Sequence, residues 1–183
     1  MAIEIEKKYK IDADIAARLA EKLVSIGAEF AYERSEENYL HRGGTVDARS
    51  IVLRVRKTDD TATLTYKERI DPSSEFKKQI EFETEIGDAA AMEEIIERLG
   101  FSLAAVYEKH RKAWNWGGVE IVLDELPFGR YMEIEGPPDG IRDAEKTLGI
   151  EHLEVELKSY PSLTLKFGIL RDGVVEARFD RKK

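Results

Sequence analysis

The chain has 183 residues, of which 29 are Lys or Arg and 37 are Asp or Glu, so its formal net charge is −8. Apolar residues at 42% and charged residues at 36% are typical of a soluble globular protein that can bury a full core. The absence of cysteine excludes disulfides, thiolate chemistry and cysteine-ligated zinc, and no apolar run is long enough to predict a membrane span.

Alternating apolar and polar residues predict a β-strand over residues 3–11. An amphipathic helix follows, beginning near Asp12 or Asp14 and ending at Gly27. Strands are then predicted over 29–40, 51–57, 62–69 and 76–86. A second helix begins at Asp88 and ends at Gly100, strands follow over 103–116, 119–126 and 129–135, and a third helix ends at Gly149.

The polar faces of these strands are charged, and the charges are sorted by strand. The acidic pairs are Glu4/Glu6, Glu81/Glu83 and Glu133/Glu135, and the basic pairs are Arg54/Arg56 and Lys109/Arg111. Like charges two residues apart on one strand face repel each other, which a merely solvated surface has no reason to repeat. Two interpretations remain open at this point: a half-exposed sheet with a wet charged face, or a closed sheet whose charged face lines a lumen.

Such a charged lumen suits one kind of ligand. Paired carboxylates without a His or Cys cluster favour hard cations such as Mg²⁺ or Mn²⁺. Lys and Arg in quantity favour phosphate oxygens. Together they indicate a site for a polyphosphate that carries divalent metal ions.

An ordered set of motifs gives a family resemblance. The N-terminal Glu4-Ile5-Glu6-Lys7-Lys8 resembles the ExExK signature of the CYTH superfamily, the triphosphate tunnel metalloenzymes. The later motifs of that family are matched in order by Leu53-Arg54-Val55-Arg56, Leu64-Thr65-Tyr66-Lys67, Glu81-Phe82-Glu83, Leu99-Gly100-Phe101, Lys109-His110-Arg111, Val122-Leu123-Asp124, Met132-Glu133-Ile134-Glu135 and Ser159-Tyr160. Residues 1–165 are covered by these matches.

The resemblance implies an α+β fold, namely a closed eight-stranded antiparallel β-barrel that forms a tunnel, with helices packed outside. It implies one domain over residues 1–168, and we expect residues 169–183 to be a C-terminal tail, whose role the sequence does not indicate. It also implies that the triphosphate is held by Lys8, Arg54, Arg56, Lys67, Lys109 and Arg111, with Lys8 as the candidate catalytic residue that orients a nucleophile. The metal ions would be held by Glu4, Glu6, Asp124, Glu133 and Glu135, with Glu81 and Glu83 in support.

Two positions depart from the family pattern. His41 stands where many relatives have Asp, so we assign it no role. Gln79 stands near a position where relatives often have Arg, and Lys77 is the nearby residue that can supply the phosphate contact.

The resemblance implies an enzyme that uses Mg²⁺ or Mn²⁺ to process a small linear triphosphate. One reaction type is hydrolysis of tripolyphosphate, thiamine triphosphate or a nucleoside triphosphate. The alternative is that of a class IV adenylyl cyclase, which makes cyclic AMP and pyrophosphate from ATP, and a second alternative is a non-catalytic polyphosphate-binding protein. We expect a cytoplasmic protein that binds neither nucleic acid nor membrane. Two outward-facing aromatic residues, Trp114 and Trp116, favour a homodimer.

Overall fold

A computed structural model describes residues 2–48, 51–70 and 74–180. Its main strands are β1 (Ala2–Ile11), β2 (Glu29–Arg42), β3 (Val52–Lys57), β4 (Ala62–Arg69), β5 (Lys77–Glu85), β6 (Ser102–Trp116), β7 (Val119–Leu126) and β8 (Gly129–Glu135). All eight lie where the alternation predicts them, and β2 and β6 extend slightly beyond the predicted ends.

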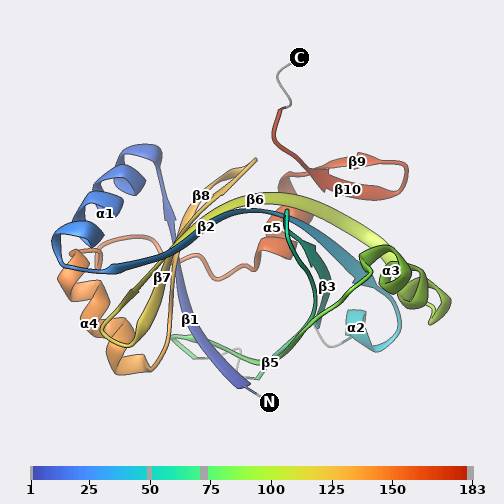
Figure 1. The fold of residues 1–183 in the computed structure, drawn as a ribbon, viewed down its shortest axis with the longest axis horizontal. Helices are drawn as coiled ribbons and strands as arrows, with labels where there is room; N and C mark the ends of the chain where they lie inside the picture. The colour runs from blue at the N-terminus through green and yellow to red at the C-terminus, as the bar shows by residue number, and fades with distance from the viewer. Residues whose placement is uncertain (1, 49–50, 71–73, 181–183) are drawn as a thin grey trace.

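These eight strands form a closed ring (Figure 1). The strand order is β2-β3-β4-β5-β1-β8-β7-β6, and a pairing between β2 and β6 closes it. Every pairing within the ring is antiparallel. The predicted α+β class and the closed arrangement of eight antiparallel strands are therefore confirmed, and the sheet has two further strands that the prediction lacked.

Three helices begin and end at the predicted signals. Helix α1 (Ala13–Ser25) begins at Asp12, whose carboxylate accepts a hydrogen bond from the Ile15 amide at 2.7 Å. Asp88 caps α3 (Ala89–Arg98) in the same way. Helix α4 (Pro138–Leu148) ends at Gly149, which has the left-handed conformation that glycine adopts most readily. Within the described part of the chain, no helix combines the length and apolar character needed to cross a membrane.

Two helices have no counterpart in the prediction. Helix α2 (Thr45–Ala48) is a single turn. Helix α5 (Tyr160–Phe167) begins at Ser159, whose hydroxyl accepts a hydrogen bond from the Ser162 amide. Both are too short for a helical period to stand out from the sequence.

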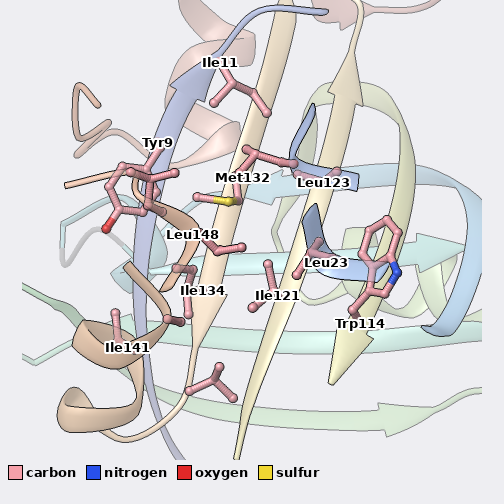
Figure 2. Close-up of a cluster of buried hydrophobic side chains, with 14 of the residues drawn as sticks. Tyr9, Ile11, Leu23, Trp114, Ile121, Leu123, Met132, Ile134, Ile141 and Leu148 are labelled. Carbon is pink, nitrogen blue, oxygen red and sulfur yellow. The ribbon is translucent and has the colours of Figure 1, made fainter. Parts of the chain in front are cut away.

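The larger apolar core lies outside the ring, where α1 and α4 cover strands β1, β7 and β8 (Figure 1). Figure 2 shows Ile121, Met132 and Ile134 of adjacent strands meeting Leu23 of α1 and Leu148 of α4. These strand residues have the opposite parity to the charged ones. Burying this outer face leaves the charged face of the same strands pointing into the ring.

A second apolar cluster fills one end of the ring interior. It consists of inward-facing strand residues and residues of α5, namely Leu40, Ala105, Tyr107, Leu126, Tyr131, Tyr160 and Leu163, together with Ala177. Because α5 contributes Tyr160 and Leu163 from the middle of this cluster, the helix closes that end. The interior is thus a cup rather than an open passage.

The C-terminal segment differs from the expected tail. Strands β9 (Ile169–Arg171) and β10 (Val174–Ala177) form a hairpin, and β10 pairs in parallel with β6 at Ala105–Tyr107. The sequence of this segment is too short and too mixed in polarity to show a strand period. Residues 181–183 of the predicted tail lie outside the described residues.

Candidate functional site

The charged half of the ring interior contains a cavity of about 330 Å³. Twelve of the thirteen predicted site residues line it: Glu4, Glu6, Lys8, Arg54, Arg56, Lys67, Glu81, Glu83, Lys109, Arg111, Glu133 and Glu135. The remaining one, Asp124, is buried behind the cavity wall. The structure therefore brings the predicted residues together, while their roles toward phosphate or metal stay predictions.

Strand register explains why these residues converge. Residues directly opposite each other in a ladder point to the same face of the sheet. Arg111 of β6 lies opposite Arg34 of β2 on one side and Asp124 of β7 on the other. On β1, Lys8 lies opposite Glu133 of β8. Each predicted pair is thereby placed on the inner wall by the alternation seen in its own strand.

Oppositely charged side chains from nearby strands pair with one another along the cavity wall. The ammonium of Lys67 lies 2.6 Å from a carboxylate oxygen of Glu4, and that of Lys77 lies 2.8 Å from Glu6. The guanidinium of Arg56 lies 2.6 Å from Glu83. The site therefore contains a set of internal ion pairs, and an anion or cation that binds there would exchange partners with them.

Burial and crowding of like charges act on the acidic side chains of the cavity. Burial, together with the neighbouring carboxylates Glu6, Glu135 and Glu81, raises the pKa of Glu4 to about 8 although Lys67 opposes the shift. Burial, with Glu6 and Glu120 nearby, raises the pKa of Glu135 to about 7. Burial also disfavours ionisation of Glu6, but Lys77, Lys8 and Lys67 outweigh it and lower its pKa.

Two buried lysines of the cavity, Lys8 and Lys109, have lowered pKa values, whereas the neighbouring Arg111 has a raised one. Burial lowers the pKa of Lys8, and burial together with Arg111 lowers that of Lys109. Arg111 is also buried, but Asp124 and Glu133 hold its pKa well above the usual range. The charge on Arg111 is therefore fixed, and the two buried lysines hold their protons less tightly than exposed ones do.

Asp124 has its carboxylate oxygens occupied by neighbouring side chains. Its two oxygens accept hydrogen bonds of 2.7 and 2.6 Å from Nε and Nη2 of Arg111. The Tyr160 hydroxyl donates a third, at 2.8 Å, and Lys109 Nζ lies 3.7 Å away. This arrangement positions Arg111 rigidly. The predicted metal-binding role of Asp124 would require these partners to move.

The donor set suits a divalent oxygen-binding cation, but the described residues hold no preformed cluster of three or more acidic, His or Cys side chains at metal-binding distance. Burial and the neighbouring carboxylates raise the pKa values of Glu4 and Glu135, so further positive charge would favour their ionised forms. A divalent cation would supply that charge. The residues therefore fit such an ion if Lys67 and Lys77 turn away from Glu4 and Glu6.

Several residues of the cavity wall and its surroundings were not predicted from the sequence as site residues. Tyr32 and Arg34 of β2 line the cavity, and Glu36 of the same strand is buried behind it, 3.2 Å from Lys109 Nζ. Their common parity along β2 was the available signal, but the sequence did not show which face of this strand points inward. Tyr107 of β6 and Glu120 of β7 also line the cavity, and each shares parity with predicted site residues of its own strand.

The two departures from the family pattern have different outcomes. Lys77 and Gln79 both line the cavity, and the Gln79 side-chain amide donates to Glu4 at 3.2 Å. Lys77 therefore lies on the cavity wall, and the phosphate contact expected of it stays a prediction. His41 is buried away from the cavity wall, and burial lowers its pKa.

Comparison with known proteins agrees with this geometry. The family model described as the CYTH domain matches residues 2–169. A protein of Methanocaldococcus jannaschii, provisionally named an adenylate cyclase, is 29% identical over 96% of this chain and 98% of its own length. A conserved hypothetical protein of Pyrococcus furiosus is 28% identical, with a TM-score of 0.74, over 87% of this chain and 99% of its own.

A more distant solved structure shows the same fold. It is a protein from Hippeastrum that is provisionally named an adenylyl cyclase and has a dominant triphosphatase activity. It is 20% identical to this chain, with a TM-score of 0.70, and the match covers 93% of this chain and 98% of that one.

Proposed function

Because this chain belongs to the CYTH family, we propose that it is a divalent-metal-dependent enzyme that hydrolyses a small linear triphosphate. The observation that carries this proposal is that one cavity wall holds eight basic residues together with the acidic pairs of β1 and β8. Phosphate oxygens would take the basic residues, and one or two Mg²⁺ or Mn²⁺ ions would take the carboxylates.

Exchange of ion-pair partners supports this reading. Lys67 and Lys77 form ion pairs with Glu4 and Glu6. A triphosphate that enters with its metal ions would bind the two lysines while the cations bind the two carboxylates. Each side chain would thus trade one partner for another of the same sign, which limits the cost of leaving a charge unpaired. Either ligand alone would leave one set of charges without partners.

The closed end of the cup favours one orientation of the substrate. Lys8, Lys109 and Tyr160 lie at the inner end, whereas Tyr32, Glu120 and Glu135 lie toward the opposite end. An organic group is bulkier and less charged than a phosphate, so it fits the open end better. The terminal phosphate would then lie innermost, beside Lys8 and Lys109.

Lys8 is the residue that we propose to orient the nucleophile. Its ammonium donates to the Lys158 carbonyl at 2.9 Å, lies 3.4 Å from Glu133 and sits over the Tyr160 ring. These contacts fix the position of the Lys8 ammonium. Its lowered pKa suits a group that hydrogen-bonds the attacking water molecule and exchanges a proton with it. Bound metal would supply Lewis-acid stabilisation of the phosphate oxygens.

Adenylyl cyclase activity is the second candidate. It is favoured by the name of the Methanocaldococcus protein, which aligns with nearly the whole chain. The ring of charges would serve this reaction as well, since both reactions develop negative charge on phosphate oxygens. We rank it second because the cavity wall is mostly charged, and its aromatic residues are three tyrosines, one of which, Tyr160, has its hydroxyl bonded to Asp124.

Product analysis separates these functions. The purified protein would be incubated with tripolyphosphate, thiamine triphosphate or ATP, each with Mg²⁺ and with Mn²⁺, and the products resolved by ion-exchange chromatography. We expect orthophosphate and no cyclic nucleotide. Cyclic AMP with pyrophosphate would instead identify the cyclase. Thermal stabilisation by tripolyphosphate without turnover of any substrate would contradict both and leave the non-catalytic binding protein.

A further inference from the structure

The outer face of β6 is covered by two different parts of the chain. Near the end of the strand, Trp114 is buried in the outer core with residues of α1, and Trp116 packs against the same core. The two aromatic residues that favoured a homodimer therefore pack within the chain. Nearer the middle of β6, the segment after β10 contacts the strand, and the ring of Phe179 stacks on that of His110 with a centroid distance of 4.4 Å.

The pairing of β2 with β6, which closes the ring, brings two acidic side chains together on its outer face. Glu37 of β2 lies directly opposite Glu108 of β6, and carboxylates in such a cross-strand pair repel each other. The neighbouring residues Glu36 and Lys109 also lie opposite each other, with a carboxylate oxygen and the ammonium 3.2 Å apart on the inner face. Repulsion on the outer face therefore acts on the stretch of pairing that carries Lys109.

Arg178 places a positive charge between the two outer carboxylates. Its Nη1 lies 3.5 Å from Glu37 and 3.1 Å from Glu108, and its Nε lies 3.4 Å from Glu176 of β10. The backbone amide of Phe179 donates a further hydrogen bond of 2.8 Å to Glu108. Because one guanidinium contacts both strands, it replaces the repulsion of the acidic pair with an attraction that spans the β2–β6 pairing.

The segment that carries Arg178 is anchored to the ring. Strand β10 pairs in parallel with β6 at Ala105–Tyr107, and Ala177 is buried in the apolar cluster that closes the cup. Arg178 directly follows this buried residue, so its backbone has little freedom to move away from β6. The match to the CYTH domain ends at residue 169, and it therefore assigns this segment no role.

We propose that Arg178 is a positioning residue that holds the seam closed behind Lys109, the seam being the β2–β6 pairing at Glu36–Glu37 and Glu108–Lys109. Without Arg178, repulsion between the outer carboxylates would move the two strands apart at this point and would carry the Lys109 ammonium away from its place in the cavity. The effect on substrate rests on the proposed function, in which Lys109 binds the terminal phosphate. The closure of the seam does not depend on it.

Amide hydrogen exchange tests the closure of the seam without any ligand. In Arg178→Gln, we expect the amides of the seam to exchange about fivefold faster than in wild type, whereas those of the β7–β8 pairing keep their rates. Adding Glu108→Gln to this variant removes the repulsion and should restore slow exchange, since the new amide oxygen can still accept the hydrogen bond from Phe179. Faster exchange in both pairings alike would indicate a general loss of stability and would overturn the proposal, as would unchanged rates at the seam or a double variant that still exchanges fast.

Binding of tripolyphosphate with Mg²⁺, measured by titration calorimetry, tests the effect on Lys109. We expect the dissociation constant to rise about fivefold in Arg178→Gln, because a charge-assisted hydrogen bond weakens when its donor is displaced, and to recover in the double variant. Arg171→Gln is the matched control, since it removes an exposed arginine of β9 at the same cost in net charge, and it should bind as wild type does. A fast-exchanging seam with unchanged binding would overturn the positioning of Lys109. A wild-type protein that does not bind tripolyphosphate would contradict the proposed function, and the exchange rates would still decide whether Arg178 closes the seam.

Discussion

The two halves of the ring interior are lined by the same strands and perform opposite tasks. Residues of one parity face inward along each strand, apart from the register shifts in β2. On β6, Ala105 and Tyr107 belong to the apolar cluster around α5, whereas Lys109 and Arg111 belong to the charged cavity. The apolar half stabilises the fold by burying apolar surface. In the charged half, like charges repel each other, and a ligand of opposite charge would reduce that repulsion.

Two residues on the same face of one strand can therefore differ in whether their substitution changes stability or turnover. In the apolar half, removing atoms should lower stability and leave charge chemistry intact. In the charged half, removing a charge should affect either stability or turnover, depending on whether its partner is protein or ligand. Four substitutions separate these cases, taken from the largest expected effect to the smallest.

Glu36→Gln should have the largest effect on stability. Its carboxylate is buried between Arg34 and Lys109, at 2.8 and 3.2 Å, so the substitution removes the nearer anionic partner of the buried Lys109 and leaves it the more distant Asp124, at 3.7 Å. Breaking a buried pair in this way costs about 3–5 kcal/mol of unfolding free energy. Burial alone would raise the Glu36 pKa, but Lys109, Arg111, Arg56 and Arg34 hold it well below its usual range.

The pH dependence of that loss follows from the direction of the shift. A carboxyl whose pKa is lowered by folding contributes stability above its unfolded pKa of about 4.5 and loses it as the pH falls through the folded value. The difference in unfolding free energy between wild type and Glu36→Gln should thus be largest near pH 7 and should decrease below pH 4.5. Urea unfolding at several pH values measures it, and a constant difference would contradict the assigned ion pair.

Glu135→Gln should change turnover instead. Because the pKa of Glu135 is raised to about 7, the amide resembles a form that the folded protein already tolerates, and we expect no loss of melting temperature. Loss of a metal-binding oxygen should lower kcat by about 100-fold, equivalent to about 2.7 kcal/mol. Glu125→Gln on the neighbouring strand β7, outside the cavity, is the control. Normal turnover in Glu135→Gln would show that the acidic pair of β8 does not serve the reaction.

Much of the division of the ring interior into an apolar and a charged half could be predicted from the sequence. The alternation predicted the strands and their charged face, because one buried face imposes a period of two wherever the outer core covers a strand. The ordered motifs then grouped residues from Glu4 to Glu135 into one site. The sequence did not indicate that α5 enters the ring, since its eight residues are too few to show a helical period and its contacts with Leu40 and Leu126 are long-range.

A weak alternation of polar and apolar residues explains why the site residues of β2 were not predicted. Glu36 and Arg34 share parity with Tyr32, but β2 also carries acidic and polar residues of the other parity, such as Glu33, Ser35 and Glu37. With both faces polar, the period of two is weak. Only the pairing of β2 with β6 shows which face is buried. The hairpin β9–β10 escaped prediction because its strands are three and four residues long.

Leu163→Ala should act on the apolar half alone. The side chain is 2% exposed and lies in the cluster that closes the cup. We expect a loss of about 2 kcal/mol in unfolding free energy, at the low end for such a change because a short helix can settle into the space. Urea unfolding measures this, and KM and kcat should change by less than twofold. A large rise in KM would instead show that the apolar half shapes the substrate site directly.

Tyr160→Phe should have the smallest effect, and it tests the boundary between the halves. The Tyr160 ring belongs to the apolar cluster and lies 4.1 Å from Lys8 Nζ, while its hydroxyl donates to Asp124 at 2.8 Å. Phenylalanine keeps the ring and removes one hydrogen bond, so we expect a loss of about 1 kcal/mol in unfolding free energy. Asp124 keeps both bonds from Arg111, so kcat should fall by less than about tenfold, or 1.4 kcal/mol. A kcat loss near 100-fold with unchanged stability would mean that the hydroxyl contacts the reacting group, and the boundary between the two halves would then lie deeper in the cup, at Leu163.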